Sequence, residues 1–172
     1  MIREQKLCEE SDIAKVEKYF FEHVNVFDVE KSVFVHSDLH MGNILHDDNK
    51  LTAIIDFDHS LKAPPVRCLL SLLGFIDYPA QFVEGTKDFP KYKGKSFYHL
   101  LPVLKEELSD IFADPLLLNK LNILFIREAI DLIASNWSEG LNKLMMQMIV
   151  ENELAENDPK FRNSYYGKIL NH

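Results

Sequence analysis

The chain has 172 residues, 47% of them hydrophobic and 27% charged, which predicts one globular domain over residues 1–172 with a sizeable core. Its formal net charge of −8 argues against a nucleic-acid binder, which needs a basic face. The sequence shows no apolar signal region, no apolar run of about 18 residues and only two distant cysteines, which predicts a cytoplasmic protein without a membrane partner.

A helix is predicted first, over residues 11–24, because Ser11 suits the N-cap and apolar residues recur at helical spacing. After a connector, a β-type run over residues 32–35 leads into a polar turn. Two further short strands are predicted over 43–46 and 51–55. The Asp and Asn residues between these two strands favour a hairpin turn, because both residue types tolerate left-handed backbone.

The rest of the chain is predicted to be mostly helical, with helices over residues 66–77, 97–112, 115–137 and 141–155. Between the first two, residues 78–96 contain several Pro and Gly residues and are predicted to form a loop. We therefore expect an α+β fold that is mostly helical and carries one small β-hairpin.

Polar residues near the ends of the predicted strands have the types and spacing of a phosphoryl-transfer site. Such a site needs a carboxylate beside the acceptor hydroxyl and oxygen ligands for Mg²⁺. His36-x-Asp38, followed by four residues and Asn43, reproduces the catalytic-loop pattern of kinases. Asp56-Phe57 takes the place of the metal-binding Asp-Phe-Gly element.

The stretch H-S-D-L-H-M-G-N-I-L, followed by I-I-D-F-D, resembles the signature of the aminoglycoside phosphotransferase family, which is related to choline and homoserine kinases. The resemblance implies a protein-kinase-like carboxy-terminal lobe that transfers the γ-phosphate of ATP to a hydroxyl of a small molecule, with Mg²⁺ and ATP as cofactors. It implies that Asp38 is the catalytic carboxylate, that Asn43 and Asp56 bind the magnesium on the nucleotide phosphates, and that His36 supports the loop. Asp58 matches a second acidic position and is a further candidate for binding metal or substrate.

The sequence departs from the family's pattern at two places. Ser37 stands where Gly or Asn is common, which is a small change. After the metal element the chain reads A-P-P-V-R-C-L-L, with Cys68 near the position of an Asp that usually opens the next helix. The second departure concerns how this segment is braced and leaves the metal ligands in place.

The resemblance also implies a nucleotide-covering lobe that the 35 residues before His36 do not supply. Kinase-like enzymes cover the nucleotide with a β-rich lobe that carries a glycine-rich loop and a strand lysine. The residues before His36 are predicted to be mostly helix and contain no glycine. We therefore expect a carboxy-terminal lobe without the β-rich nucleotide lobe. Three interpretations stay open: a truncated form that is inactive alone, a homodimer or partner chain that supplies the lobe, or a catalytically silent binding or structural module.

The acidic character of residues 1–60 is a clue to the charge of the acceptor substrate. Residues 1–60 carry 13 acidic and 6 basic side chains. This surplus suits a divalent metal and a small, cationic hydroxylated substrate. A solvated acidic helix explains the same surplus without any substrate.

A metallohydrolase is the remaining alternative. His36, Asp38 and His40 alternate in the sequence, with two further histidines nearby, and an extended segment would present them together as a zinc cluster. Under this hypothesis the presence of Asn43 and Asp56 would be a coincidence.

Overall fold

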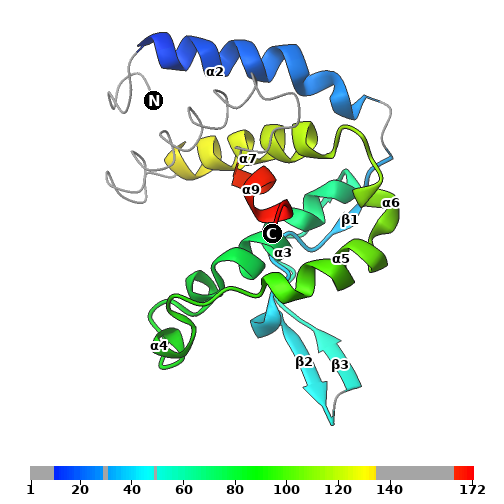
Figure 1. Ribbon diagram of the computed structural model, residues 1–172, viewed down its shortest axis with the longest axis vertical. Coiled ribbons are helices and arrows are strands. Elements are labelled where there is room, and N and C mark those ends of the chain that lie inside the picture. Colours follow the sequence, from blue (N-terminus) through cyan, green and yellow to red (C-terminus); the bar gives the residue numbers. More distant parts are fainter. Residues whose placement is uncertain (1–9, 29–30, 49, 135–164) are drawn as a thin grey trace. The chain divides into compact units, whose positions relative to one another are not determined.

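The computed structural model describes residues 10–28, 31–48, 50–134 and 165–172. The contacts within the chain divide it into two compact units. One unit comprises Met1–Val29 with Pro115–Asn171, and the other comprises Glu30–Asp114 with His172. The first is helical in its described part, and the second carries the strands (Figure 1). The single domain expected from chain length stays a prediction.

The first unit is built from helices that share an apolar core. Its described elements are α2 (Glu10–His23), the short 3₁₀ turn η1 (Val24–Phe27), α7 (Leu117–Ala134) and α9 (Tyr165–Leu170). Helix α7 contacts both α2 and α9. The side chains that these helices bury are spaced as amphipathic helices require, and they include Ile13, Val16, Tyr19, Leu121, Ile126, Ala129 and Ile169.

The predictions for this unit are confirmed where the structure describes them. Helix α2 matches the helix predicted over 11–24 within one residue. Helix α7 matches the described part of the helix predicted from residue 115, although its first turn begins two residues later than the proline start signal suggested. The helix predicted over 141–155 lies outside the described residues.

The strands of the second unit form two separate antiparallel pairs. Strand β1 (Val33–Val35) pairs with β4 (Leu61–Ala63), and β2 (Ile44–Asp47) pairs with β3 (Lys50–Ile54). The three strands expected from the sequence are confirmed, whereas β4 was not predicted. The residues of β4 are only three and directly precede two prolines, so they carry no pattern of their own and become a strand by pairing with β1.

The β2–β3 hairpin extends away from the helices of its unit (Figure 1). Ile44 lies opposite Ile54 and Leu45 opposite Ala53, and the register shifts by one residue after Leu45. Asp48, in the two-residue connection, has φ +45, which an Asp tolerates better than a branched residue. The hairpin turn predicted from the Asp and Asn residues is therefore confirmed.

After its strands, the second unit continues in short helical elements. They are the 3₁₀ turns η3 (Pro65–Arg67), η4 (Pro79–Val83) and η5 (Tyr98–Leu100), and the helices α3 (Cys68–Asp77), α4 (Phe89–Tyr92), α5 (Leu101–Glu107) and α6 (Ser109–Phe112). Helix α3 is the core element, because Leu69 and Leu73 are fully buried. Its prediction as a buried helix over 66–77 is confirmed.

Two predictions for these helices were wrong. Residues 78–96 contain η4 and α4, so they are partly helical, because the two prolines there each open a short helical turn. The helix predicted over 97–112 is interrupted at Leu108, whose φ −110 and ψ 33 lie outside the helical region. The Leu108 carbonyl then accepts hydrogen bonds from the amides of both Ile111 and Phe112, which starts α6 in a new direction.

No helix in the described part of the chain combines the length and the apolar character that are needed to cross a bilayer.

Candidate active site

A short loop, from His36 to Gly42, connects the β1–β4 pair to the β2–β3 hairpin. Its second residue, Ser37, has φ +66, a left-handed conformation that favours Gly or Asn. Two later residues brace the loop. Ser60 Oγ donates to the His36 carbonyl at 3.3 Å, and Arg67 Nε donates to Ser37 Oγ at 3.3 Å. The segment after Asp58 is thus tied to the loop by residues that the sequence did not single out.

Asp38 and Asn43 are brought together by this loop. The Asn43 amide nitrogen donates to the Asp38 carbonyl at 2.9 Å and lies 3.4 Å from its carboxylate oxygen Oδ2. Asn43 is buried, and its own backbone amide donates to the His40 carbonyl at 3.0 Å in the 3₁₀ turn η2 (Met41–Asn43). These contacts hold the side-chain nitrogen of Asn43 toward Asp38.

His36 links the loop to the end of β3. Its Nε2 donates to the Ile55 carbonyl at 2.8 Å, and its ring packs against Phe57 with centroids 4.6 Å apart. A carbonyl oxygen only accepts, so the proton of the imidazole is on Nε2. These contacts support the predicted role of His36 as a structural partner of the loop, which stays a prediction.

Asp56 follows Ile55, whose backbone amide and carbonyl are both hydrogen-bonded. The Ile55 amide donates to the Asn43 carbonyl at 3.0 Å, while the Ile55 carbonyl accepts from His36. Asp56 itself has φ +63 and an exposed side chain. A left-handed Asp at the end of a strand is uncommon and often marks a functional position. The residue before Asp56 is thus tied through its backbone to Asn43 and to His36.

The carboxylates of Asp56 and Asp58 make no hydrogen bond or ion pair with Asp38 or Asn43 among the described residues, and both side chains are exposed. The chemistry of the Asn43 and Asp56 side chains suits magnesium, because an amide and a carboxylate both offer oxygen atoms and the carboxylate of Asp56 is open to solvent. Mg²⁺ prefers such hard oxygen ligands and takes few of them from the protein.

The zinc cluster that a metallohydrolase would need is not formed. His36 Nε2 is bonded to a backbone carbonyl, and His40 Nδ1 accepts a hydrogen bond from the Gly42 amide at 3.1 Å. In the part of the chain that the structure describes, no group of three or more His, Cys, Asp or Glu side chains is placed to hold a metal ion. The metallohydrolase alternative therefore loses its structural basis.

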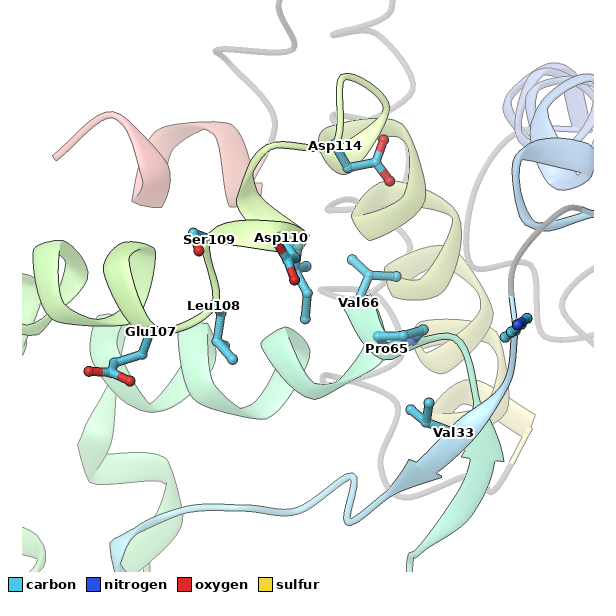
Figure 2. A pocket seen from close by; sticks show the side chains of 10 residues that line it. Val33, Pro65, Val66, Glu107, Leu108, Ser109, Asp110 and Asp114 are labelled. Carbon is cyan, nitrogen blue, oxygen red and sulfur yellow. The ribbon is translucent and has the colours of Figure 1, made fainter.

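Two cavities of the second unit are lined in part by Val33 of β1 and by Pro65. The larger, about 520 Å³, opens between the Pro65–Val66 turn and the Leu108–Ile111 segment, with Asp110 and Asp114 on its rim (Figure 2). None of the predicted site residues lines it. A smaller cavity of about 310 Å³ reaches the back of the loop at Ser37 and includes Cys68, the pKa of whose thiol is raised by burial. Cys68 is half-buried, and a protonated thiol packs as an apolar group, which suits the start of α3.

Comparison with protein families gives one match. The model of the phosphotransferase enzyme family matches residues 3–95, which is more than half of the chain and includes the whole stretch from His36 to Asp58. No curated protein and no solved structure matches the chain.

Proposed function

Because the chain belongs to the phosphotransferase enzyme family, we propose that it transfers the γ-phosphate of ATP to a hydroxyl group of a small molecule in a reaction that requires Mg²⁺. The observation that carries this proposal is the contact between Asp38 and Asn43, which the Ile55 backbone links to Asp56. This connection supports a site to which residues up to 18 positions apart in the sequence contribute, as phosphoryl transfer needs.

Each of these residues has a distinct role in the proposed reaction. Asp38 orients the acceptor hydroxyl, whose oxygen forms a bond to the γ-phosphorus as the bond to the leaving ADP oxygen breaks. Asp38 accepts the hydroxyl proton late in this step, when that proton has become acidic. Asn43, through Oδ1, and Asp56 would hold Mg²⁺, which supplies neutralisation of the phosphate charge. Asp58 is a further candidate ligand.

A cationic acceptor and a separately supplied nucleotide lobe complete the proposal. The acidic surplus of residues 1–60 would attract a small hydroxylated amine. No glycine precedes His36, and the described residues before Val33 contain no strand, so the adenine half of ATP would be covered by a lobe from a longer form of the protein, from a second copy or from a partner chain.

The proposal is tested by incubating the protein, alone and with an added nucleotide lobe, with γ-labelled ATP, Mg²⁺ and a panel of hydroxylated amines. We expect label to appear in an acceptor, and we expect Asp38→Ala to abolish this transfer without unfolding the protein. Asp47→Ala, which removes an exposed carboxylate from the hairpin strand β2, is the matched control and should transfer normally. Full transfer by the Asp38→Ala variant would reject the assignment.

A titration with Mg²⁺ and ATP distinguishes the proposed enzyme from the silent module. Binding that is lost in Asp56→Asn supports the metal site, because the carboxamide cannot supply the charge that the carboxylate does. Absence of binding at millimolar nucleotide, both alone and with an added nucleotide lobe, would favour a module without catalysis.

A further inference from the structure

His40 lies in the same loop as Asp38, and the proposed function gives it no role. We infer that His40 is a positioning residue that holds the carboxylate of Asp38 in one orientation. This inference rests on the proposed function, since it assumes that Asp38 faces the acceptor.

The first observation is the protonation of the imidazole. His40 Nδ1 accepts a hydrogen bond from the Gly42 amide at 3.1 Å, so this nitrogen carries a lone pair and no proton. With Nδ1 as the acceptor, the N–H group of the ring is at Nε2. The ring nitrogen that bears the proton is the one that faces Asp38, with Nε2 3.8 Å from Oδ2.

The second observation is that the ring has little room to turn. Its side chain is only 14% exposed, and it packs against the ring of Phe82 with centroids 4.8 Å apart. On its other side lies Gly42, where the Cβ of any other residue would come within 2.8 Å of His40 Cε1. A side chain at position 42 would therefore have to displace the ring, so ring and turn hold each other in place.

The third observation concerns the two oxygens of the Asp38 carboxylate. Oδ2 is approached by the Asn43 amide nitrogen at 3.4 Å and by His40 Nε2 at 3.8 Å. Both groups are N–H donors, and within the described residues no hydrogen bond or ion pair is formed by Oδ1. The distance to His40 is longer than a hydrogen bond, but such contacts commonly shorten when substrate binds. Donors on Oδ2 leave Oδ1 for the acceptor hydroxyl.

Two substitutions of His40 distinguish the role of Nδ1 from the role of Nε2. In His40→Asn, the side-chain oxygen can still accept from the Gly42 amide as a cap, but no donor reaches Asp38. In His40→Gln, the amide nitrogen can take the place of Nε2, but no acceptor lies beside the Gly42 amide. If the Nε2 donor positions Asp38, the Gln variant should behave like the wild type and the Asn variant should not.

The orientation of Asp38 is measured by NMR on the whole chain without nucleotide. Three-bond couplings to Asp38 Cγ report its χ1 angle. We expect values of a single rotamer in the wild type and in His40→Gln, and averaged values in His40→Asn. Gly42→Ala, which pushes the ring aside, should average them as well. The side-chain ¹⁵N spectrum should show His40 protonated on Nε2 alone.

Unchanged Asp38 couplings in both His40→Asn and Gly42→Ala would overturn the inference, as would a His40 ring that carries its proton on Nδ1. These outcomes are separate from a failure of the proposed function, because the couplings require neither nucleotide nor acceptor. In the transfer assay with Mg²⁺ and ATP, His40→Asn should lower kcat by roughly 10- to 100-fold and leave KM for ATP unchanged. A change in KM alone would contradict a positioning role. Absence of transfer by the wild type would count against the proposed function only.

Discussion

A single residue, Asn43, connects the loop from His36 to Gly42 with the segment that follows strand β3. Its side-chain nitrogen satisfies the Asp38 carbonyl, and its backbone carbonyl accepts from Ile55. Both partners belong to segments that the proposed reaction uses, so one buried residue sets the distance between the proposed base and the metal element. The types of these residues were readable in the sequence, but their contacts were not, because hydrogen bonds across 5 and 12 positions depend on the turn geometry.

Replacing Asn43 with Asp tests this connection. The substitution exchanges an N–H donor for an oxygen that faces the Asp38 carbonyl and carboxylate, so a part-buried acceptor loses its partner and two like charges meet. We expect the free energy of unfolding, measured by urea denaturation, to fall by about 1–3 kcal/mol. Asn25→Asp, at an exposed position of η1, should change it by less than about 0.5 kcal/mol. Equal effects of the two substitutions would contradict the connection.

A second residue-scale feature is the hydrogen bond that Tyr98 donates to Asp77. Burial, this hydrogen bond and the negative charge of Asp77 together raise the pKa of Tyr98 to about 12. In the unfolded chain a tyrosine titrates near pH 10. The folded state therefore binds this proton more tightly, and the stability that results is complete below about pH 10 and is lost as the pH rises toward 12.

The Tyr98→Phe variant should lack this dependence of stability on pH. In the wild type, tyrosinate absorbance should include a late step near pH 12, and stability should fall with rising pH between about 10 and 12. Tyr98→Phe should lack the late step, whereas Tyr78→Phe, at an exposed position, should retain it. A late step that survives in Tyr98→Phe would show that another tyrosine is responsible.

At the scale of the elements, local pattern was sufficient for some segments and insufficient for others. Helices α2 and α3 and strands β1 to β3 were predicted, because their apolar residues recur at the spacing of the element that they form. Strand β4 was missed because its strand character comes from pairing with β1, 26 or more residues away. The interruption at Leu108 was missed because the apolar pattern continues through it. Contacts distant in sequence decide such features.

Two glycines, Gly74 in helix α3 and Gly94 after helix α4, should change stability in opposite directions when each is replaced by alanine. Gly74 is inside helix α3, where glycine costs roughly 0.5–1 kcal/mol relative to alanine. A Cβ there would meet Gln81 Nε2 at 3.1 Å, but this is the end of an exposed, flexible side chain that can move. Gly74→Ala should therefore raise the free energy of unfolding by about 0.5 kcal/mol.

Gly94→Ala is the matched substitution. Nothing lies within 4 Å of the added carbon, but φ is +72, so the methyl group is strained by its own backbone. We expect the free energy of unfolding to fall by about 1 kcal/mol. If both substitutions shift stability in the same direction, backbone conformation is not what distinguishes these glycines.

At the scale of the whole molecule, the family match and the compact units do not coincide. The matched residues 3–95 include α2 of the first unit and all four strands of the second. The family was recognisable from the sequence because its signature is a short run of polar residues at fixed spacing. The acceptor, the partner and the source of the nucleotide lobe were not recognisable, because the acidic surplus of residues 1–60 specifies no geometry. The site residues had their types and order predicted, while the bracing by Ser60 and Arg67 emerged only from the fold.

The proposal that Asn43 and Asp56 share a metal can be examined without any turnover. Mn²⁺ has the same preference for oxygen ligands as Mg²⁺ and broadens the NMR signals of nearby nuclei. With ATP present, we predict that Mn²⁺ broadens the resonances of Asp38, Asn43 and Asp56 first, and that Asp56→Asn removes this selectivity. Broadening that begins instead at the hairpin turn around Asp47 and Asp48, or that is unaffected by Asp56→Asn, would contradict the assignment.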